Sequence, residues 1–351
     1  MIKRPPRTGG KLEKKVNILL VDGNALFKRA FLGAKTLYNN KGQHIGGVYQ
    51  FITILRKLLN ENIYHKVFCF WDGEFSGKLR YQIYKDYKID REKNYESGTK
   101  PVDENEVIQK IQIQRYLEEV FIRQYEDEIV ESDDTIAYIC NNKKDNEVIT
   151  ICTSDRDLCQ LIDDDVSIYM LDLKTYINKE NYNDFFEYRF ENVKTVKILC
   201  GDNSDSIKGI DRLGEPTLLK HFPELKTEVV DVETIVNKAK LINDERVLNK
   251  QKPLKVLSNI VENVTTGLQG KKIYEINEKL VNLKKPLLTD KVKNDLKELK
   301  EFDLDPEGRS MKNVYNMMKE DGIYNEIKNY SEDYLLPFKK LVDRELNNNV
   351  N

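Results

Sequence analysis

Short apolar runs alternate with segments of helical periodicity over the first 190 residues of the chain. The runs at 16–21, 66–71 and 148–153 predict buried parallel strands, and 166–171 is expected to be a fourth. Between them, apolar residues at helical spacing predict a helix over 47–60, and 106–125 is also expected to be helical. Strands joined through helices indicate an α/β fold in which a central, mostly parallel sheet is flanked by helices.

The remaining segments set the expected organisation of the chain. Residues 127–131 are expected to form a short strand leading to Glu131, and a helix is expected to begin at Ser132, with Ser132 as its N-cap and acids in its first turn. Beyond about residue 190, amphipathic segments rich in Lys, Asn and Glu predict helices and few strands. We therefore expect a flexible basic arm at 1–15, an α/β core at 16–195 that contains an aliphatic-poor region at 74–105, and a helical region at 196–351.

The composition narrows the class of protein. Hydrophobic residues make up 40% of the 351 positions and charged residues 33%, and the net charge is −2, which fits a globular protein with a heavily charged surface. No apolar run approaches the roughly 18 residues that cross a bilayer, and no apolar signal core follows the basic N-terminus, so we expect a cytoplasmic protein without a secretion signal. The five cysteines form no Cys-x-x-Cys pair and histidines number only three, which favours free thiols over disulfides or a structural zinc site.

Acidic residues follow the predicted strands at the point where each strand ends. Because the carboxyl ends of parallel strands meet at one edge of a sheet, where ligands bind in open α/β folds, these residues are expected to gather there. Taken singly, each has an ordinary interpretation as a turn residue, a helix-capping partner or part of a surface loop. The residues are Asp22, Asp72, Glu131, Asp133, Asp134, Asp155 and Asp157, with Asp202 and Asp205 added by a later loop at 201–206.

The combination of these acids indicates a metal site. Several carboxylates on one edge repel one another unless cations neutralise them. Oxygen ligands without His or Cys favour Mg²⁺ or Mn²⁺ over zinc. Two such ions about 4 Å apart can activate a water and stabilise both the attacking and the leaving oxygen of a phosphoryl transfer. The sequence therefore predicts a two-metal phosphoryl-transfer site at this edge of the sheet.

Basic and aromatic residues are interleaved in the region after Asp72. If that stretch is helical, Tyr84, Lys88 and Arg91 share one face. Basic side chains contact phosphates and tyrosines stack on unpaired bases, so the region is a candidate for contact with a single strand. The alternative is a surface helix whose cations pair with neighbouring acids. The interleaved residues are Arg80, Tyr81, Tyr84, Lys85, Tyr87, Lys88 and Arg91, and the acids are Asp86, Asp90 and Glu92.

The chain carries, in this order, the motifs Leu-Leu-Val-Asp22-Gly, Phe-Trp-Asp72-Gly, Glu131-Ser-Asp133-Asp134, Thr-Ser-Asp155-Arg-Asp157 and Gly-Asp202-Asn-Ser-Asp205. Over about residues 16–225 it resembles the structure-specific 5′-nuclease family, the flap endonucleases and 5′–3′ exonucleases, and most of all bacteriophage members such as the T-even phage ribonuclease H. The resemblance implies a PIN-like nuclease core and a helical arch. It implies an inner metal site of Asp22, Asp72, Glu131, Asp133, Asp155 and Asp157, and a second metal supported by Asp134, Asp202 and Asp205, some of them through water.

The resemblance also implies contacts with a single strand. Lys88 and Arg91, in Tyr-Lys-x-x-Arg, match the basic pair at the base of the arch at 74–105. As catalytic residues they would contact the scissile phosphate and stabilise its developing charge. Arg80, Tyr84 and Tyr87 would contact the single-stranded 5′ end.

Residues 200–225 match the family's helix–hairpin–helix element, which grips duplex phosphates. Lys208, Gly209 and Gly214 would make these contacts. The hairpin departs from the family's glycine-rich pattern, because Arg212 stands where glycine is usual and Pro216 removes an amide donor.

The function implied is that of a divalent-metal-dependent 5′-nuclease, using two Mg²⁺ ions with Mn²⁺ as substitute. It would remove 5′ flaps or RNA primers from duplex DNA during replication. The expected partner is a duplex with a 5′ flap, nick or RNA primer, with a sliding clamp and a single-strand-binding protein as candidates, and the protein is expected to be a monomer. Two alternatives stay open: a non-catalytic protein of this fold that binds branched nucleic acid, and a PIN-type ribonuclease. A pure binder gains nothing from concentrated acids beside a phosphate, and a PIN-type ribonuclease gives no reason for the basic and aromatic arch.

An apolar cluster at 334–338 lies near the C-terminus. Packing onto the nuclease body is the favoured interpretation. A docking peptide for a clamp or a single-strand-binding protein is the alternative.

Overall fold

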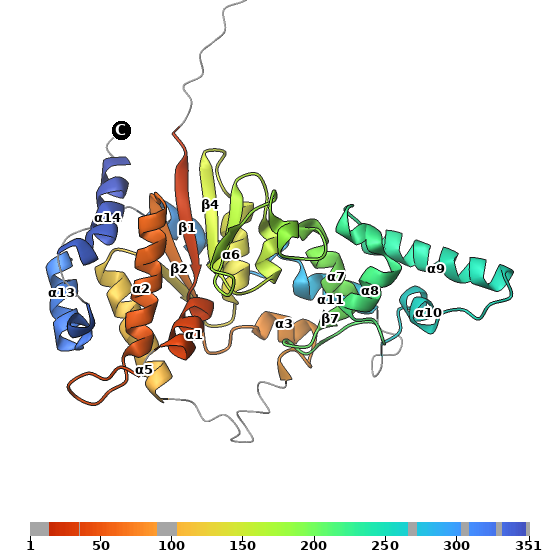
Figure 1. Ribbon diagram of the computed structural model, residues 1–351, viewed down its shortest axis with the longest axis horizontal. Coiled ribbons are helices and arrows are strands. Elements are labelled where there is room, and N and C mark those ends of the chain that lie inside the picture. Colours follow the sequence, from red (N-terminus) through yellow and green to blue (C-terminus); the bar gives the residue numbers. More distant parts are fainter. Residues whose placement is uncertain are drawn as a thin grey trace, which may run out of the picture.

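A central sheet of parallel strands, closed on one side by an antiparallel strand, organises the protein (Figure 1). The computed structural model describes residues 14–34, 36–89, 104–265, 272–302, 309–327 and 332–348. Within these residues the strand order is β3-β2-β1-β4-β5-β6, with β1 to β5 parallel and β6 antiparallel to β5. The predicted α/β fold with a mostly parallel sheet is confirmed. The strands are β1 (Val16–Asp22), β2 (Lys66–Asp72), β3 (Arg123–Asp127), β4 (Glu147–Thr153), β5 (Val166–Met170) and β6 (Thr175–Ile177).

Helices cover both faces of the sheet, which explains why its central strands are almost wholly apolar. Side chains alternate between the faces along β1. Leu19 and Val21 belong to the core formed with α1, α2 and α5, whereas Ile18 and Leu20 belong to the core formed with α6. The two-residue period of a strand thereby builds one hydrophobic core on each side. These helices are α1 (Gly23–Gly33), α2 (Gly46–Glu61), α5 (Glu104–Glu119) and α6 (Ser132–Asn141).

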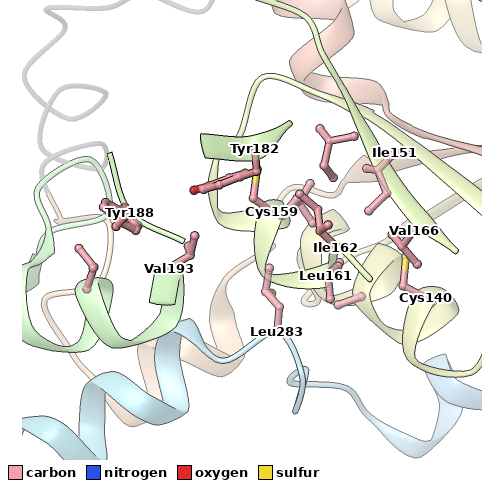
Figure 2. Close-up of a cluster of buried hydrophobic side chains, with 14 of the residues drawn as sticks. Cys140, Ile151, Cys159, Leu161, Ile162, Val166, Tyr182, Tyr188, Val193 and Leu283 are labelled. Carbon is pink, nitrogen blue, oxygen red and sulfur yellow. The ribbon is translucent and has the colours of Figure 1, made fainter. Parts of the chain in front are cut away.

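Figure 2 shows part of the core on the α6 side, where segments far apart in the sequence meet. Ile151 of β4 and Val166 of β5 lie near Cys140 of α6, and Leu283 enters the same cluster from the C-terminal half of the chain. Burial of apolar side chains from both halves therefore ties the helical region to the sheet that carries the acids.

The chain beyond residue 190 is mainly helical, as predicted, with one short two-stranded ribbon of β7 (Gly201–Asp202) and β8 (Ile207–Lys208). In Figure 1, helices α7 to α11 extend to one side of the sheet, whereas α13 and α14 lie beside α2 on the other side. α12 packs against α6 and β3. The bounds are α7 (Val193–Cys200), α8 (Glu215–His221), α9 (Val232–Leu248), α10 (Lys255–Glu262), α11 (Ile273–Val281), α12 (Asp290–Glu301), α13 (Met311–Glu320) and α14 (Leu336–Asn348).

Short 3₁₀ helices and one short α-helix complete the described elements. They are α3 (Lys78–Ile83), η1 (Asp157–Leu161), η2 (Tyr182–Asp184), η3 (Phe190–Asn192), η4 (Pro223–Lys226), η5 (Ile323–Glu326) and η6 (Glu332–Tyr334).

The apolar cluster at 334–338 packs onto the body of the protein, which confirms the favoured interpretation. Tyr334, Leu335 and Phe338 are buried in the core on the α2 side. Arg56 of α2 donates a hydrogen bond from Nε to the Tyr334 carbonyl at 2.8 Å and lies over the Tyr334 ring. A partner would have to pull these rings out of the core to bind them, so the segment does not form an exposed docking peptide.

Two predicted boundaries around β3 are wrong. The strand expected at 127–131 ends at Asp127, and the helix expected to reach residue 125 ends at Glu119. Phe121, with φ at 64° in the left-handed region, turns the chain away from the helix axis. The Asp127 carboxylate then accepts hydrogen bonds at 3.0 Å from the backbone N–H groups of Ile129 and Val130, and this local turn ends the strand.

The predicted helical face of Tyr84, Lys88 and Arg91 is also wrong. Helix α3 ends at Ile83, and Tyr84 has an extended backbone with φ at −138° and ψ at 109°. The Tyr84 ring is buried in a small cluster with Ile198 of α7. Arg91 lies outside the described residues. Burial of one tyrosine, rather than a continuous amphipathic pattern, thus decides the course of the chain here.

All five cysteines carry free thiols, as expected. Within the described ranges, none of the helices combines the length and the apolar composition that crossing a bilayer requires.

Candidate active site

The acids predicted from the strand ends line one cleft of about 490 Å³ at the carboxyl edge of the sheet. Asp22 ends β1, Asp72 ends β2, and Asp155 follows β4. Asp133 comes from the first turn of α6. Eight of the nine predicted acids line the cleft, namely Asp22, Asp72, Glu131, Asp133, Asp155, Asp157, Asp202 and Asp205. Asp134 is buried behind it.

Neither Asp-Gly pair after a strand is an ordinary turn. A Cβ on Gly23 would lie 2.6 Å from the Trp71 ring and 2.8 Å from the Phe70 carbonyl oxygen. A Cβ on Gly73 would lie 2.4 Å from the Asp127 carbonyl oxygen. Real side chains do not fit at such distances, so both glycines allow neighbouring chain segments to close up directly behind the acids. The motif is a packing requirement of the sheet edge.

Backbone and hydroxyl donors orient the inner acids. Asp22 caps α1, since its Oδ1 accepts the Ala25 N–H at 2.9 Å, and its Oδ2 accepts the Thr153 hydroxyl at 2.8 Å. Thr153, the last residue of β4, also accepts the Asp155 N–H at 2.9 Å. This buried threonine was not predicted as a site residue. Its only signal in the sequence is a hydroxyl at the end of an apolar strand.

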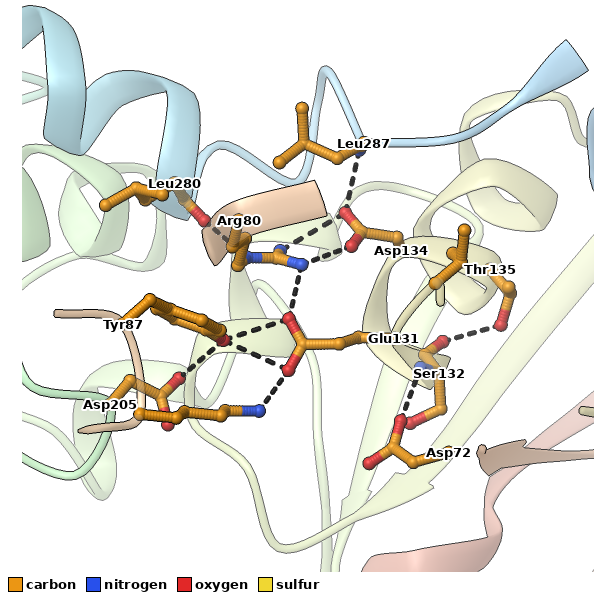
Figure 3. A network of polar contacts seen from close by, with 12 residues as sticks. Asp72, Arg80, Tyr87, Glu131, Ser132, Asp134, Thr135, Asp205, Leu280 and Leu287 are labelled. Carbon is orange, nitrogen blue, oxygen red and sulfur yellow. Dashed lines mark hydrogen bonds and ion pairs between the residues drawn. The ribbon is translucent and has the colours of Figure 1, made fainter. Parts of the chain in front are cut away.

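The predicted N-cap role of Ser132 is wrong, because the cap of helix α6 lies one residue earlier and Asp72 stabilises the first turn. Glu131 is the N-cap residue, with no hydrogen bond from its side chain to the helix, and Ser132 is the first helical residue. The Asp72 carboxylate accepts the Ser132 N–H at 2.7 Å (Figure 3). An acid from a neighbouring strand thus does what the predicted serine cap would do.

Four of the inner acids have no cationic partner among the residues that the structure describes. In the part of the chain that the structure describes, no lysine or arginine forms an ion pair with Asp22, Asp72, Asp133 or Asp155. Burial, followed by the charges of Asp72 and Asp155, raises the pKa of Asp22 to about 7. The same two causes raise the pKa of Asp133 well above its usual range. This half of the cleft therefore needs a bound cation to hold its carboxylates ionised together.

Glu131 and Asp134, in contrast, are paired with cations of the protein. Figure 3 shows Arg80 of α3 between Glu131 and Asp134. Its Nη1 lies 2.5 Å from Glu131 Oε2, and its Nη2 lies 3.2 Å from Asp134 Oδ1. Burial would raise the pKa of Glu131, but Arg80 and Lys88 outweigh it and lower that pKa to about 2. Asp134 Oδ1 also accepts the Leu287 N–H at 2.9 Å, and its Oδ2 pairs with Arg80 Nη1, so both of its oxygens are engaged.

The residues predicted to contact the single strand are largely covered by protein. Arg80 is buried, and its Nε donates to the Leu280 carbonyl at 2.9 Å. Tyr84 is 5% exposed and Tyr87 is 4% exposed, so neither ring is open to a base in this arrangement. The Tyr87 hydroxyl donates to Glu131 at 2.9 Å and to Asp205 at 3.2 Å (Figure 3).

Lys88 is held at the wall of the cleft. Its ammonium group pairs with Glu131, and its backbone N–H donates to the Asp205 carbonyl at 2.9 Å. Its φ of 55° is left-handed, a conformation that costs of order 1–3 kcal/mol for a residue other than glycine. Surrounding contacts therefore fix the lysine in an unfavourable backbone conformation beside the acids. Arg91, the other predicted basic residue, lies outside the described residues.

Lys197 is a site residue that the sequence did not reveal. It projects from α7, with Nζ 2.8 Å from Asp157 Oδ1 and 2.6 Å from Asp202 Oδ2. Burial, then the charge of Asp155, raises the pKa of Asp157 to about 7 although Lys197 opposes that rise. The available signal was a lysine five residues before Asp202 on a helix that also carries Lys194, a pattern too common to single out.

The hairpin at 200–225 keeps a tight form in spite of its unusual sequence. Arg212 takes the left-handed conformation of a glycine, with φ at 66°. Pro216 lies in the first turn of α8, where backbone N–H groups have no partner within the helix, so its missing N–H breaks no helical hydrogen bond. A Cβ on Gly209 would lie 2.1 Å from the Cys200 carbonyl, so that position admits only glycine. Lys208 and Gly214 are exposed at the hairpin.

The donor set of the cleft fits a divalent cation that prefers oxygen ligands. Its acids supply carboxylates only, and four of them lack a cationic partner among the described residues. As the side chains stand, no three His, Cys, Asp or Glu residues of the described ranges already form a set that could hold a metal ion.

Sequence comparisons relate this cleft to known enzymes. A family model described as the 5′–3′ exonuclease N-terminal resolvase-like domain matches residues 17–190. The 5′–3′ exonuclease of Mycoplasmopsis pulmonis is 32% identical over 269 residues, covering 71% of this chain and 85% of that enzyme. DNA polymerase I of Bacillus subtilis is 30% identical over 237 residues, covering 65% of this chain and 26% of the polymerase. The chain thus spans about a quarter of that relative's length.

Solved structures show the same fold. The T5 5′-exonuclease with zinc ions bound has a TM-score of 0.62 at 17% identity, covering 81% of this chain and 98% of that one. The T5 flap endonuclease in a complex with DNA and metal ions has a TM-score of 0.58 at 18% identity, covering 82% of this chain and 100% of that one. The sequence match to the Mycoplasmopsis enzyme and the fold agree. This chain therefore belongs to the 5′–3′ exonuclease family of 5′-nucleases.

Proposed function

We propose that this protein is a divalent-metal-dependent 5′-nuclease that hydrolyses phosphodiester bonds in 5′ flaps or RNA primers on duplex DNA. The observation that carries the proposal is the group of four unpaired acids in a cleft whose rim holds Lys88 and Lys197. Mg²⁺ is the proposed ion because the cleft offers oxygen ligands alone, and Mn²⁺ shares that preference. Zinc and DNA in the related T5 structures support a divalent metal and a nucleic-acid substrate.

Asp22, Asp72, Asp133 and Asp155 are the proposed inner ligands, with Glu131 and Asp157 completing that site. Two divalent ions, when bound, would supply a nucleophile from water and neutralise charge on the phosphate. One oxygen of Asp72 accepts the Ser132 N–H, which leaves its other oxygen for an ion. Both oxygens of Asp22 already accept hydrogen bonds, from the Ala25 N–H and the Thr153 hydroxyl, so an ion would share one of them through its second lone pair.

The outer acids serve the proposed second ion in different ways. Asp202 and Asp205 line the cleft and are placed to act there, directly or through water. Asp134 does not line it, because Arg80 and the Leu287 N–H engage both of its oxygens. We assign Asp134 the role of holding Arg80 at the base of α3, which in turn fixes Glu131.

Lys88 is the proposed catalytic cation. Its ammonium group neutralises Glu131 in this structure. With Glu131 serving as a metal ligand, Lys88 would turn toward the scissile phosphate and stabilise its developing negative charge. Lys197 holds Asp157 and Asp202 together, and its positive charge would reduce the repulsion between these acids and a bound phosphate.

Cleavage of a 5′-labelled flap duplex tests the proposal. DNA and RNA versions of the 5′ strand are incubated in Mg²⁺, in Mn²⁺ and in EDTA, with wild-type protein and with Asp155→Asn. We expect cutting near the junction in either metal, none in EDTA, and loss of cutting but not of binding in the variant. Asp165→Asn is the matched control, because Asp165 lies at the opposite end of the sheet and pairs with Lys15 at 3.1 Å.

The alternatives give different results in the same assay. Tight junction binding without cleavage in any metal would indicate the non-catalytic protein. Cleavage of single-stranded RNA that ignores the junction would indicate a PIN-type ribonuclease. Normal cleavage by Asp155→Asn in Mg²⁺ would refute the metal assignment.

The expected partner is a duplex with a 5′ flap, nick or primer, and the proposed location is the cytoplasm. Sliding clamps and single-strand-binding proteins stay candidate partners, through surfaces other than 334–338. Sedimentation of the protein with and without a flap duplex would test the expected monomer.

A further inference from the structure

A second cavity, of about 420 Å³, lies beside the acidic cleft and contains two exposed aromatic side chains. Phe75, from the loop after β2, is 52% exposed, and Tyr81 of α3 is 41% exposed. Single exposed apolar side chains are common on protein surfaces, but these two rings line the same cavity and give it an aromatic wall. The volume lies within the roughly 300–1,000 Å³ of small-ligand sites.

The loop that carries Phe75 is firmly placed. The Phe75 N–H donates to the Glu128 carbonyl at 2.9 Å, and the Gly73 N–H donates to the Asp127 carbonyl at 3.2 Å. Gly77, with φ at 90°, then turns the chain into α3, and a Cβ there would lie 3.1 Å from the Tyr87 ring. The cavity is therefore bounded by backbone that is hydrogen-bonded to the β3–α6 loop, and its aromatic wall is preformed.

This cavity adjoins the acidic cleft. Tyr87 and Lys88 line both of them. A strand with one phosphate at Lys88 can therefore place the adjoining nucleotide in the aromatic cavity without leaving the protein surface.

The charges around the cavity favour a base over a phosphate in its interior. Lys78 and Lys88 supply cations on one part of the wall, but Glu74 and Glu128 line another part and would repel a phosphate. Carboxylates accept hydrogen bonds from the amino groups of bases. Tyr81 already holds a cation against one face of its ring, since Lys85 Nζ lies 4.4 Å from the ring centre.

We propose that Phe75 and Tyr81 form a subsite for one unpaired nucleobase of the 5′ strand, with the adjoining phosphate directed to Lys88. The inference rests on the proposed nuclease function and adds the residues that hold the substrate. It also moves the base-stacking role from Tyr84 and Tyr87, whose rings are buried, to two rings that are open.

Flap duplexes with a single abasic nucleotide test the subsite. The abasic position is moved one nucleotide at a time from the junction into the flap, and each duplex is bound to Asp155→Asn in Mg²⁺, so that cleavage does not interfere. Binding is measured by fluorescence anisotropy. We expect one position at which loss of the base weakens binding by roughly 5- to 100-fold, the range of one stacked base.

The variants Phe75→Ala and Tyr81→Ala, made in the same background, show whether these rings hold that base. Each is expected to weaken binding of the intact flap and to show little further loss when the base at that position is removed. A 2-aminopurine at the same position should be quenched by the parent protein and less so by either variant. Phe302→Ala is the matched control, because Phe302 is 55% exposed and lies at the other end of the sheet, next to Arg123.

Two outcomes would overturn the inference. If Phe75→Ala and Tyr81→Ala bind every duplex as tightly as the parent, the cavity holds no base, and a peptide of a partner protein becomes the better occupant. If losses from the variants and from the abasic position simply multiply, the rings and that base do not touch. Failure of the wild-type protein to cleave any flap would instead refute the proposed function. The subsite is tested by binding and not by cleavage, so the two failures can be told apart.

Discussion

Replacing Lys197 by methionine tests the electrostatics of the cleft without removing a predicted metal ligand. The lysine lies 2.8 Å from Asp157 and 2.6 Å from Asp202, and its side chain is 23% exposed. Methionine keeps much of the aliphatic volume and deletes the charge. Without the lysine, Asp157 and Asp202 would repel each other and the neighbouring inner acids, and no positive charge would lie between them.

The magnitude follows from the burial of the pair. At 2.8 Å and an effective dielectric constant near 20, one such contact is worth about 6 kcal/mol before desolvation is subtracted. Removing one partner of a buried pair costs about 3–5 kcal/mol, because the remaining charge is left unpaired. Since Lys197 keeps some solvent contact, we expect Lys197→Met to lower the free energy of unfolding in EDTA by about 3 kcal/mol.

Urea unfolding in EDTA at pH 8 measures this loss, followed by the same experiment in Mg²⁺. Magnesium should restore much of the stability of Lys197→Met, because a bound cation replaces the missing charge. Adding Asp157→Asn to Lys197→Met should also recover stability. Lys194→Met is the control on the same helix: its pair with Glu278, at 3.2 Å, is more than one-third exposed on both sides and is worth about 0–1 kcal/mol.

Two results would refute the reasoning. Equal stability of Lys197→Met and Lys194→Met in EDTA would mean that Asp157 and Asp202 do not carry negative charges that repel each other in the folded protein. A loss that neither Mg²⁺ nor Asp157→Asn reduces would mean that the lysine acts through packing.

Three further predictions concern other parts of the molecule. Lys88→Ala should lower kcat more than it raises KM. If the lysine stabilises developing charge, the loss of transition-state stabilisation should be about 2.7–4 kcal/mol. Equal losses in both constants would make it a positioning contact only. In EDTA the protein should lose stability as pH rises from about 4 to 7, because Asp22, with a pKa of about 7, keeps in the native state a proton that the unfolded state has already released. Calorimetry at pH 5 and pH 8 measures this loss, and Mg²⁺ should stabilise most at pH 8. A melting temperature that rises over this range in EDTA would contradict the prediction. Arg123→Ala should lower the free energy of unfolding in urea by about 3–5 kcal/mol, since Arg123 of β3 pairs with Glu345 of α14 and both side chains are almost fully buried. Loss of flap cleavage at a temperature where the variant is still folded would show that the pair does more than hold α14.

The sequence by itself determined where the acids lie along the chain and why they meet. Continuous apolar runs of strand length are buried on both faces only inside a sheet that is covered on both sides, and parallel strands bring their carboxyl ends to one edge. The placement of Asp22, Asp72 and Asp155 follows from those two facts. The helical character beyond residue 190 also follows from local periodicity.

Only the tertiary structure decided which charges compensate one another. Arg80 reaches Glu131 across 51 residues and Leu280 across 200, and Lys197 reaches Asp157 across 40 residues. No local pattern encodes such pairs, because they depend on how separate helices pack around the sheet edge. Packing also overrode the helical pattern at Tyr84, whose burial against α7 ended the helix, and left Phe75 and Tyr81 exposed instead. Local periodicity fixes which face of an element is buried, whereas the chemistry of the cleft depends on contacts between elements that only the folded chain brings together.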